Sequence, residues 1–428
     1  MRVLVVNAGS SSLKLSVLDE RDQLLTAEVL PAPGGQVDQA ALKELVARCS
    51  PIDAVGHRIV HGGTDFTAPV LVDAQVVRRL EVLSDLAPLH QPKSLRGLQS
   101  VTRMLPHVPA VACFDTAFHA TIPAAAATYA LPVQWRRRWD LRRFGFHGLS
   151  HSYASRRVAK MLGPAAGPAG DARSPARQGP APSAHEGPAP SAHEGPAPSA
   201  HEGPGPSVHP DAGPSAYQGS GGRSRLVTCH LGAGASLAAV RDGVCVDTTM
   251  GFTPNEGLVM ATRSGSVDPG LLLWLEEHVG MPSSELASTL EHRSGLLGLC
   301  GTADMRAALE AESQGDLDAT LAIGVYLHRL RAGIAAMVAA LGGLDALVFT
   351  GGVGEHSAPI RWRAAEGLGY LGVSLDEATN RAAQPDWELS AAGAAVRSFV
   401  IEAREDLEIA RGVREVLGDA VPGEGGPS

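Results

Sequence analysis

The chain has 428 residues, 44% of them hydrophobic, so it is long enough to form two large domains with sizeable cores. Its formal charge of −9 is mild for this length and gives no general attraction to nucleic acid or to anionic membranes. The five cysteines are an odd number and include no closely spaced pair, which argues against a disulfide framework or a zinc site. We expect a cytoplasmic protein with reduced thiols. The apolar run before Asn7 is too short for a signal peptide, and the longest run, residues 332–344, is too short for a membrane span.

The segment 3–19 predicts two strands joined by a tight turn, because four apolar residues lead into NAGSSS and alternating apolar residues follow. Such a turn can hold an anion, since glycine lets the backbone approach closely and the N–H and O–H groups donate. It is not a Walker loop, because neither a Gly-Lys-Ser/Thr sequence nor a helix follows. An ordinary polar hairpin is the alternative for this segment taken alone.

Residues 135–143 interleave arginines with two tryptophans. They could stack on nucleic-acid bases. The interpretation that we favour is a solvated face beside a phosphate channel.

Between residues 163 and 222 the composition collapses into Gly, Pro, Ala, Ser and His, and the octapeptide GPAPSAHE occurs three times over residues 179–202. There is little apolar surface to bury here, so we predict a disordered insertion, partly of polyproline type. Its regularly spaced histidines (185, 193, 201 and 209) suggest a metal tether as the alternative. Flexible imidazoles without fixed partner ligands bind metal weakly, which favours a tolerated insertion.

A second copy of the N-terminal arrangement follows at residues 226–240, where LVTCHLGAGASLAAV predicts strand, glycine turn and strand. A third glycine turn, residues 349–356, follows the apolar run 346–348. Two hairpins with phosphate-type turns, one in each half, suggest a duplicated domain that holds a nucleotide between its halves.

Two helices are predicted in the second half of the chain. The first has a buried face made by apolar residues at helical spacing: Leu317, Leu321, Val325, Ile334, Val338 and Leu341. The second is C-terminal and is marked by Leu407, Ala410 and Val413.

Nine segments in one order resemble the acetate kinase family (acetate/propionate kinases of the actin-like superfamily). They are NAGSSSLK (7–14), HRIVHGG (57–63), APLHQP (87–92), FDTAFH (114–119), RRFGFHGLSH (142–151), HLGAGAS (230–236), residues 247–270, ADMR (303–306) and FTGGVGEHS (349–357). The resemblance covers nearly the whole chain except the insertion. It implies an α/β fold of two duplicated actin-like (ribonuclease H-like) ATPase domains with a cleft between them.

The implied domains are residues 1–150 with a returning helix at about 390–420, and residues 151–389, with the insertion 163–222 inside the second. Residues 421–428 are expected to be a flexible tail. By the family's habit the protein is expected to be a homodimer.

Phosphoryl transfer requires in-line positioning and charge stabilisation, which suit the planar, permanently ionised fork of arginine. The resemblance implies that Arg58 and Arg263 flank the phosphoryl group and that Arg58 also contacts the carboxylate substrate. It makes His147 a donor to the transition state. The spacing of His147 and His151 also suggests a zinc pair, but Gly148 and the missing glutamate argue against it.

Asp115 resembles the family's catalytic carboxylate. Acetate is already ionised near neutral pH, so we expect Asp115 to orient Arg58 or the metal shell more than to move a proton. A buried structural role is the alternative. The resemblance places Asn7 and Glu405 at Mg²⁺, with Mn²⁺ as another candidate ion. An ordinary acid in the first turn of a helix is the alternative for Glu405.

The remaining site residues also follow from the resemblance. Those that would hold ATP or ADP are Lys14, His230, Leu231, Gly232, Ala233, Gly234, Asp304, Met305, Arg306, Gly352, Val353, Gly354, Glu355 and His356. The acetate pocket would be lined by Val60, Leu89, Phe146 and Pro254, and its apolar walls suit a methyl group. Ala233 and His356 depart from the asparagines common in the family, which we expect to affect nucleotide affinity more than catalysis.

The sequence therefore predicts an enzyme that transfers phosphoryl from ATP to acetate, with no nucleic-acid or membrane partner. A propionate or butyrate kinase is the near alternative. A non-catalytic actin-like nucleotide binder is the alternative from another class.

Overall fold

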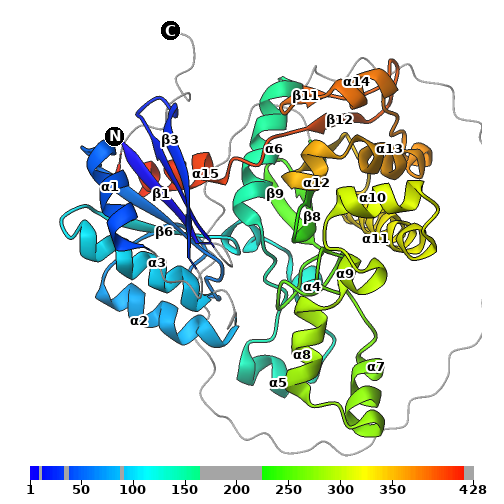
Figure 1. The fold of residues 1–428 in the computed structure, drawn as a ribbon, viewed down its shortest axis with the longest axis horizontal. Helices are drawn as coiled ribbons and strands as arrows, with labels where there is room; N and C mark the ends of the chain where they lie inside the picture. The colour runs from blue at the N-terminus through cyan, green and yellow to red at the C-terminus, as the bar shows by residue number, and fades with distance from the viewer. Residues whose placement is uncertain (9–11, 33–37, 87–90, 164–223, 419–428) are drawn as a thin grey trace, which may run out of the picture. The chain divides into compact units, whose positions relative to one another are not determined.

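The computed structural model describes residues 1–8, 12–32, 38–86, 91–163 and 224–418, and it contains two six-stranded sheets (Figure 1). The first sheet has the order β3-β2-β1-β4-β6-β5. Its strands are β1 (Val3–Ala8), β2 (Ser12–Leu18), β3 (Leu24–Pro31), β4 (Ala54–Ile59), β5 (Val70–Leu71) and β6 (Ala110–Phe114). The strands β1, β2 and β3 form an antiparallel meander, whereas β4 and β6 continue the sheet in parallel with β1.

Successive residues of β1 supply both faces of this sheet, as the pleat requires. Leu4 and Val6 pack in a cluster with residues of α1 (Gln39–Cys49) and α3 (Gln91–Met104). Val3 and Val5 pack on the opposite face with residues of α15 (Glu405–Leu417). The first sheet is therefore covered on both sides, and its C-terminal helix comes from the far end of the sequence.

The second sheet repeats this topology, with the order β11-β12-β10-β7-β8-β9. Its strands are β7 (Arg225–Leu231), β8 (Ala235–Arg241), β9 (Val244–Thr248), β10 (Ala346–Thr350), β11 (Trp387–Glu388) and β12 (Arg397–Val400). Again a meander of three strands is followed by two parallel strands and a short antiparallel edge strand. The predicted duplication of an actin-like α/β domain is confirmed.

Each face of the second sheet carries a main helix. α6 (Gly148–Leu162) packs on β7 and β10, and α11 (Leu317–Leu341) packs on β7, β8 and β9. α6 also packs against α15, where Ser152 donates to Glu408 at 2.8 Å and Arg156 pairs with the same carboxylate. β12 belongs to the second sheet and α15 to the first, so the chain returns to the first sheet at Glu405. The domain boundaries themselves stay a prediction.

The other helices lie in the connections. They are α2 (Ala74–Val82), η2 (Leu83–Leu86), η3 (Ala117–His119), α4 (Ala124–Ala127), α5 (Val133–Trp139), α7 (Pro269–Trp274), η4 (Leu275–Val279), α8 (Ser283–His292), α9 (Gly295–Cys300), α10 (Met305–Ser313), α12 (Gly351–His356), α13 (Ala358–Glu366), η5 (Gly369–Leu371) and α14 (Glu377–Ala382).

The predicted helix at residues 317–341 exists with those bounds, but its predicted buried face is wrong in the first two turns. Leu317 is 82% exposed and Leu321 is 58% exposed, whereas Ala319, Ala322 and Ile323 are buried. Apolar residues lie all around this helix, so their spacing does not select one face. By length and hydropathy α11 could also cross a membrane, but that is weak evidence, because the helix packs in the core against β8, α9 and α10.

Both predicted glycine hairpins are confirmed as pairs of antiparallel strands, β1 with β2 and β7 with β8, although Gly9, Ser10 and Ser11 lie outside the described residues. The third predicted glycine turn is wrong, because Gly351–His356 forms the short helix α12 directly after β10. Gly351 adopts φ = 78°, which only glycine adopts readily, and this lets the chain change direction at once from strand to helix. The predicted disorder of the insertion and of the tail falls outside the described residues.

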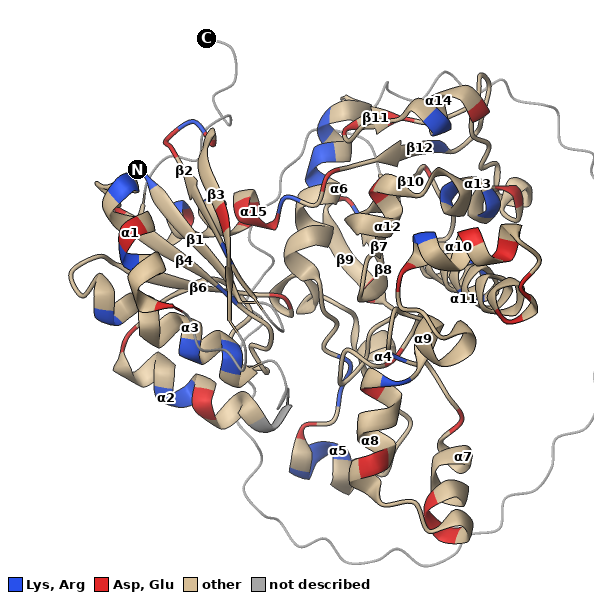
Figure 2. Cartoon of the chain, viewed as in Figure 1, with Lys and Arg blue, Asp and Glu red and all other residues tan. Residues whose placement is uncertain are grey.

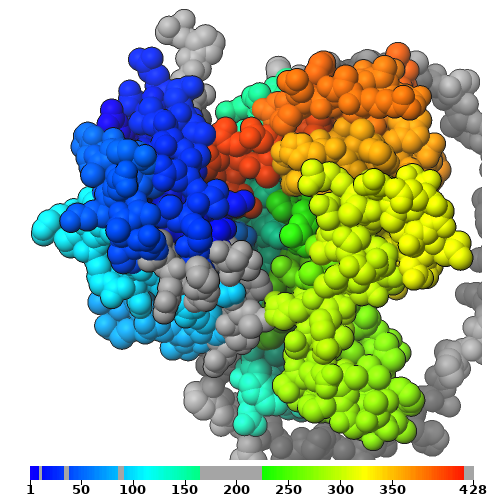
Figure 3. Space-filling view, in the orientation of Figure 1, coloured from blue at the N-terminus to red at the C-terminus, as the bar shows by residue number. Residues whose placement is uncertain are grey.

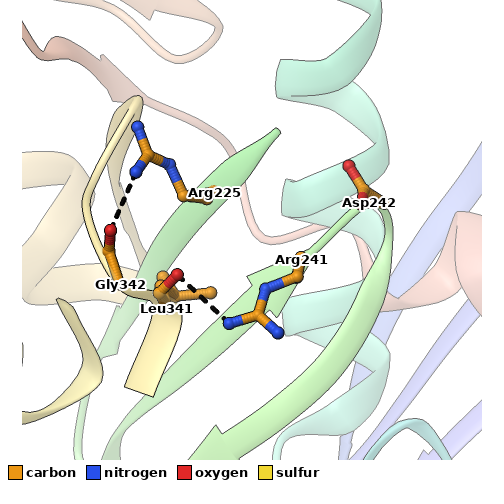
Figure 4. Close-up of a pocket in the computed structure, with 5 residues that line it drawn as sticks. All are labelled: Arg225, Arg241, Asp242, Leu341 and Gly342. Atoms are coloured by element: carbon orange, nitrogen blue, oxygen red, sulfur yellow. Dashed lines mark hydrogen bonds between the residues drawn. The ribbon is translucent and has the colours of Figure 1, made fainter. Parts of the chain in front are cut away.

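A hollow of about 590 Å³ lies where α11 ends against β7 and β8 (Figure 4). Arg225 donates to the carbonyl of Gly342 and Arg241 to the carbonyl of Leu341. Arg225 is also paired with Asp345 at 2.7 Å. Both arginines satisfy carbonyls that the helix end leaves free and complement its dipole. Their arrangement is explained by the fold.

Replacing Gly56 by alanine is expected to lower the free energy of unfolding by about 1–3 kcal/mol, because overpacking displaces buried groups. A Cβ on Gly56 would overlap Ile409 and lie 2.9 Å from a methyl of Val413, at the contact between β4 and α15. Urea unfolding measures the effect. Gly324→Ala is the matched control, since its Cβ would meet nothing within 4 Å in α11 and should stabilise the helix by up to about 1 kcal/mol. Equal effects at the two positions would refute this packing argument.

Candidate active site

Arg58 and Asp115 form a two-point ion pair at the ends of neighbouring strands. Arg58 is the fifth residue of β4, and Asp115 directly follows β6, which runs parallel to β4. The Arg58 Nε lies 3.1 Å from both carboxylate oxygens, and its NH2 lies 2.6 Å from Oδ2. Asp115 is 1% exposed, so this pair holds the guanidinium in one orientation.

Asn7 and Glu405 complete this cluster from β1 and from the start of α15. Asn7 donates its amide N–H to Glu405 at 2.8 Å, and its carbonyl oxygen accepts from Arg58 at 3.0 Å. Lys14 lies opposite Asn7 in the β1–β2 ladder, and its side chain is exposed. Glu405 is also one of three acids in the first turn of α15, where the ribbon is coloured red in Figure 2. The structure thus brings Asn7 and Glu405 together beside Arg58.

The charges of this cluster support one another. Burial acts to lower the pKa of Arg58, but the carboxylates of Asp115 and Glu405 outweigh it and raise that pKa. Burial acts to raise the pKa of Glu405, but Arg58, His230, the Asn7 hydrogen bond and Lys14 together lower it. Burial raises the pKa of Asp115, although Arg58 opposes this rise. The arginine therefore stays charged between two carboxylates.

His147 and Arg263 meet at Gly234, the last glycine of the second hairpin. His147 precedes α6 in a left-handed conformation (φ = 58°), and its ring stacks on His230 with centroids 4.3 Å apart. A Cβ on Gly234 would lie 3.0 Å from Nε2 of His147 and 3.6 Å from NH2 of Arg263. Only glycine leaves this space beside the two side chains.

Arg263 is held differently from Arg58. Its NH1 donates to the carbonyl of Pro254 at 3.0 Å, and no carboxylate of the described residues lies within 4 Å of its guanidinium. Burial lowers the pKa of Arg263, and the charge of Arg58 adds to this effect, while Glu291 opposes it. This cation is therefore available to an anionic ligand.

A pocket of about 590 Å³ lies next to the second hairpin. Eight of the residues predicted to hold a nucleotide line it: Gly232, Ala233, Asp304, Met305, Arg306, Gly352, Val353 and His356. Sequence reasoning missed five other lining residues, namely Ala261, Leu296, Ala303, Tyr326 and Ser357. Ala261, Ala303 and Ser357 lie in or beside the motifs that were recognised, whereas Leu296 and Tyr326 carry no local signal.

The other predicted nucleotide residues do not line this pocket. Lys14 lies on the first sheet, and Leu231 is buried at the end of β7. The Glu355 carboxylate accepts from the backbone N–H groups of Gly351 and Ala403, at 2.9 and 3.0 Å. It therefore ties α12 to the loop that precedes Glu405. Nδ1 of His230 lies 2.8 Å from the hydroxyl oxygen of Ser150. Gly354 packs beneath the second hairpin.

The structure describes three of the four residues that were predicted to line the acetate pocket. Val60 and Phe146 are buried in one apolar cluster, and Pro254 lies beside Arg263, to which its carbonyl is bonded. Leu89 lies outside the described residues. The alternative of a zinc pair is not supported, because His147 and His151 contact Ser236 and no group of three metal-binding side chains occurs in the described ranges.

The basic segment at residues 135–143 divides into two parts. α5 buries none of its residues, and Trp135 and Trp139 are exposed. Arg143 instead turns inward, donating to the carbonyls of Thr249 and Met250 and to Glu256 at 2.7 Å. Arg143 therefore supports the loop that carries Pro254.

We expect the free energy of unfolding to fall as pH drops from about 6.5 towards 4. Burial lowers the pKa of His57 to about 3 and those of His61, His119 and His230 to about 4, with His147 and His151 also well below 6.5. These groups are neutral when folded and take up protons on unfolding, so their stabilisation is complete above pH 6.5 and is lost below it, at up to about 1.4 kcal/mol per pH unit for each histidine.

Urea unfolding at a series of pH values measures this slope. Because His57 would then take up no proton on unfolding, His57→Leu should reduce the slope by about one proton. A stability that is constant between pH 6.5 and 4 would contradict the expectation.

Two sheets of the same topology, glycine hairpins at their ends and converging arginines define a phosphotransferase of the actin-like class. A model of the acetokinase family matches residues 36–169 and 220–411, which together are more than half of the chain. The chain therefore belongs to the acetokinase family.

Individual relatives agree with this assignment. The chain is 38% identical to an acetate kinase of Nostoc punctiforme, over 97% of this chain and 100% of that protein. It is 37% identical to an acetate kinase of Streptomyces griseus, over 98% of this chain and 97% of that protein. Among solved structures, a propionate kinase of Francisella tularensis has a TM-score of 0.78 and an acetate kinase of Porphyromonas gingivalis 0.77, both with 30% identity, covering 97% of this chain and 99% of theirs.

Proposed function

We propose that this enzyme transfers the terminal phosphoryl group of ATP to acetate, giving acetyl phosphate and ADP, and that it catalyses the reverse reaction. The proposal depends on two arginines in different surroundings. Arg58 is fixed by its ion pair with Asp115, whereas Arg263 has no carboxylate partner in the described ranges. Both guanidinium groups lie among buried side chains. An anionic acceptor and a charged phosphoryl group require such cations. The acceptor oxygen of acetate is already ionised, so no general base is needed.

Each arginine has a separate task in this proposal. Arg58, oriented by Asp115, would bind the acetate carboxylate and one edge of the moving phosphoryl group. Arg263 and His147, on either side of Gly234, would stabilise the charge on the equatorial oxygens. Val60, Phe146 and Pro254 would enclose the methyl group of acetate.

The nucleotide would occupy the pocket beside the second hairpin. Gly232 and Ala233 on one side and Gly352 and Val353 on the other offer backbone close to the phosphates. Asp304, Met305 and Arg306 at the start of α10 would contact the nucleoside.

Asn7 and Glu405 fit Mg²⁺, or Mn²⁺ as an alternative. An amide oxygen and a carboxylate lie together beside Arg58, and Mg²⁺ in kinases is held by one or two protein oxygens together with phosphates and water. When bound, the ion would neutralise phosphate charge.

The test is to trap the acyl phosphate with hydroxylamine while acetate, propionate and butyrate are supplied with ATP and Mg²⁺. Turnover is expected to be highest with acetate, although one methylene discriminates by only about 1–3 kcal/mol. Higher turnover with propionate, the substrate named for the Francisella relative, would overturn the choice of acetate. Nucleotide binding without any acyl hydroxamate would favour the non-catalytic alternative.

We also propose that two copies associate through α7 and η4. α7 buries none of its residues, and Leu271, Leu273, Trp274 and Val279 are all exposed. The segment that carries them is yellow-green in Figure 3. Apolar side chains gathered in this way favour a protein interface. Light scattering should give a dimer for the native chain and a monomer for Trp274→Glu, while Tyr370→Glu, at an exposed residue elsewhere, should remain dimeric.

A reducing compartment such as the cytoplasm is the proposed location. All five cysteines are free, and burial raises the pKa values of Cys113, Cys229 and Cys245, which keeps them as inert thiols.

A further inference from the structure

A line of buried polar side chains connects His147 to the core of the second sheet. Nδ1 of His147 lies 2.9 Å from Oγ of Ser236 on β8, and the same oxygen lies 2.8 Å from Nε2 of His151. Nδ1 of His151 lies 2.7 Å from Oγ1 of Thr228 on β7. Ser236, His151 and Thr228 are completely buried, so water does not compete for these hydrogen bonds.

The protons in this line can be counted. A neutral imidazole carries one N–H, and a serine hydroxyl has one proton. In the described residues the Ser236 hydroxyl bonds to these two ring nitrogens and to no other acceptor, so it donates to one and accepts from the other, because accepting from both would leave its own buried proton unpaired. The whole line must therefore point one way: either His147 carries its proton on Nε2, or it carries its proton on Nδ1 and presents a bare Nε2.

Both histidines are neutral near pH 7. Burial lowers the pKa of His147 well below its usual value, and His230, His151, Arg58 and Arg263 face the ring and add to this effect. Burial likewise lowers the pKa of His151, which faces His119 and His230. The direction of the hydrogen bonds, and not a second proton, therefore decides what His147 presents to the site.

Thr228 ends the line and sets its direction. Its hydroxyl has two acceptors, Nδ1 of His151 at 2.7 Å and the carbonyl of Ala238 at 3.5 Å. Hydrogen bonds from hydroxyls are 2.5–3.0 Å long, so the proton goes to His151. His151 then carries its own proton on Nε2 and donates to Ser236, which donates to Nδ1 of His147.

We propose that Thr228, acting through His151 and Ser236, fixes His147 in the Nε2–H tautomer, so that this neutral imidazole faces Gly234 and Arg263 as a hydrogen-bond donor. The proposal rests on the proposed function in one respect, namely that a phosphoryl oxygen is the acceptor. Thr228, His151 and Ser236 are positioning residues, because they act on the reaction only through His147. No proton is taken from solvent when the phosphoryl group binds.

Two-bond ¹⁵N–¹H NMR spectra of the full chain, labelled at histidine, distinguish the two tautomers. Signals are assigned by their loss in His147→Gln and His151→Gln. Both rings are expected as Nε2–H tautomers in the native protein. An Nδ1–H tautomer at His147 in the native protein would by itself overturn the proposal.

Thr228→Val removes the hydroxyl and keeps the shape of the side chain. Nothing then bonds Nδ1 of His151, so both histidines should become mixtures of the two tautomers instead of pure Nε2–H forms, with kcat reduced about tenfold or more and the KM values for ATP and acetate within about twofold. Thr228→Ser should restore the tautomers and kcat. Thr350→Val, at another buried hydroxyl, which has no hydrogen-bond partner in the described part of the chain, is the matched control and should leave both tautomers unchanged. Unchanged tautomers in Thr228→Val would refute the proposal.

Ser236→Ala removes the hydroxyl that links His147 to His151. It provides a second test of the proposal if Thr228→Val does not fold. His151 should keep its Nε2–H tautomer, since Thr228 still donates to it, while His147 becomes a mixture. A pure Nε2–H signal from His147 in this variant would contradict the proposal. The spectra need no acyl substrate, so failure of the hydroxylamine assay and failure of this inference are distinguishable.

Discussion

Arg263→Ala is expected to lower kcat by about 10³-fold or more, while the KM values for acetate and ATP change much less. Arg263 donates only to the Pro254 carbonyl, and it has no carboxylate within ion-pair distance in the part of the chain that the structure describes. Its charge is therefore available to the phosphoryl group, whose negative charge is shared among the equatorial oxygens during transfer. Steady-state kinetics with the hydroxylamine assay measures the loss.

Two further substitutions sharpen this prediction. Arg263→Lys keeps the charge but loses the planar fork, so it should recover only part of the lost kcat. Arg293→Ala, at an exposed arginine that follows α8, should leave kcat within about twofold of the native value. Thermal unfolding of all three variants should resemble that of the native protein. If Arg263→Ala keeps most of its turnover, the role proposed for Arg263 is wrong.

The sequence predicted the repeated hairpins because strand periodicity and glycine turns are local signals. It also placed Asn7 and Glu405 in one site, although 398 positions separate them, because the resemblance to the family assigns both residues to one metal ion. The face of α11 was not predictable, since apolar residues surround that helix and only its packing on the second sheet selects which are buried. The sequence predicted a turn at Gly351–His356. The structure has a helix there instead, and this helix packs on β7.

The supporting residues of the site were beyond sequence reasoning for a different reason. Ser236 ends the recognised segment HLGAGAS and Thr228 lies within β7, but neither position marks its hydroxyl as a hydrogen-bond partner of His147 or His151. Leu296 and Tyr326 reach the proposed nucleotide pocket from helices α9 and α11. These relations depend on which strands and helices lie together, and a single sequence does not reveal that.

Asp115→Asn is expected to lower kcat by about 10²-fold, since misplacing a positioning group by about 1 Å has an effect of that size. The asparagine keeps the shape of the side chain, but its NH₂ group faces the N–H groups of Arg58 where an oxygen now accepts at 2.6 Å. Arg58 would then turn towards Glu405, which lies 3.9 Å from its Nε. The KM for acetate should rise, because the same guanidinium is proposed to bind the carboxylate. The free energy of unfolding should fall by about 1–3 kcal/mol, less than for a fully buried pair.

Asp345→Asn provides the matched control for this change. Asp345 pairs with Arg225 through the same two-point geometry, at 3.1 and 2.7 Å, but the pair lies by the hollow at the end of α11, and each side chain is 35% exposed. The control should lose little stability, because exposed ion pairs contribute at most about 1 kcal/mol, and its kcat should not change. Equal losses of kcat in the two variants would mean that any arginine–aspartate pair of this fold is needed for folding. A loss confined to Asp115→Asn would instead identify the orientation of Arg58 as the requirement for phosphoryl transfer.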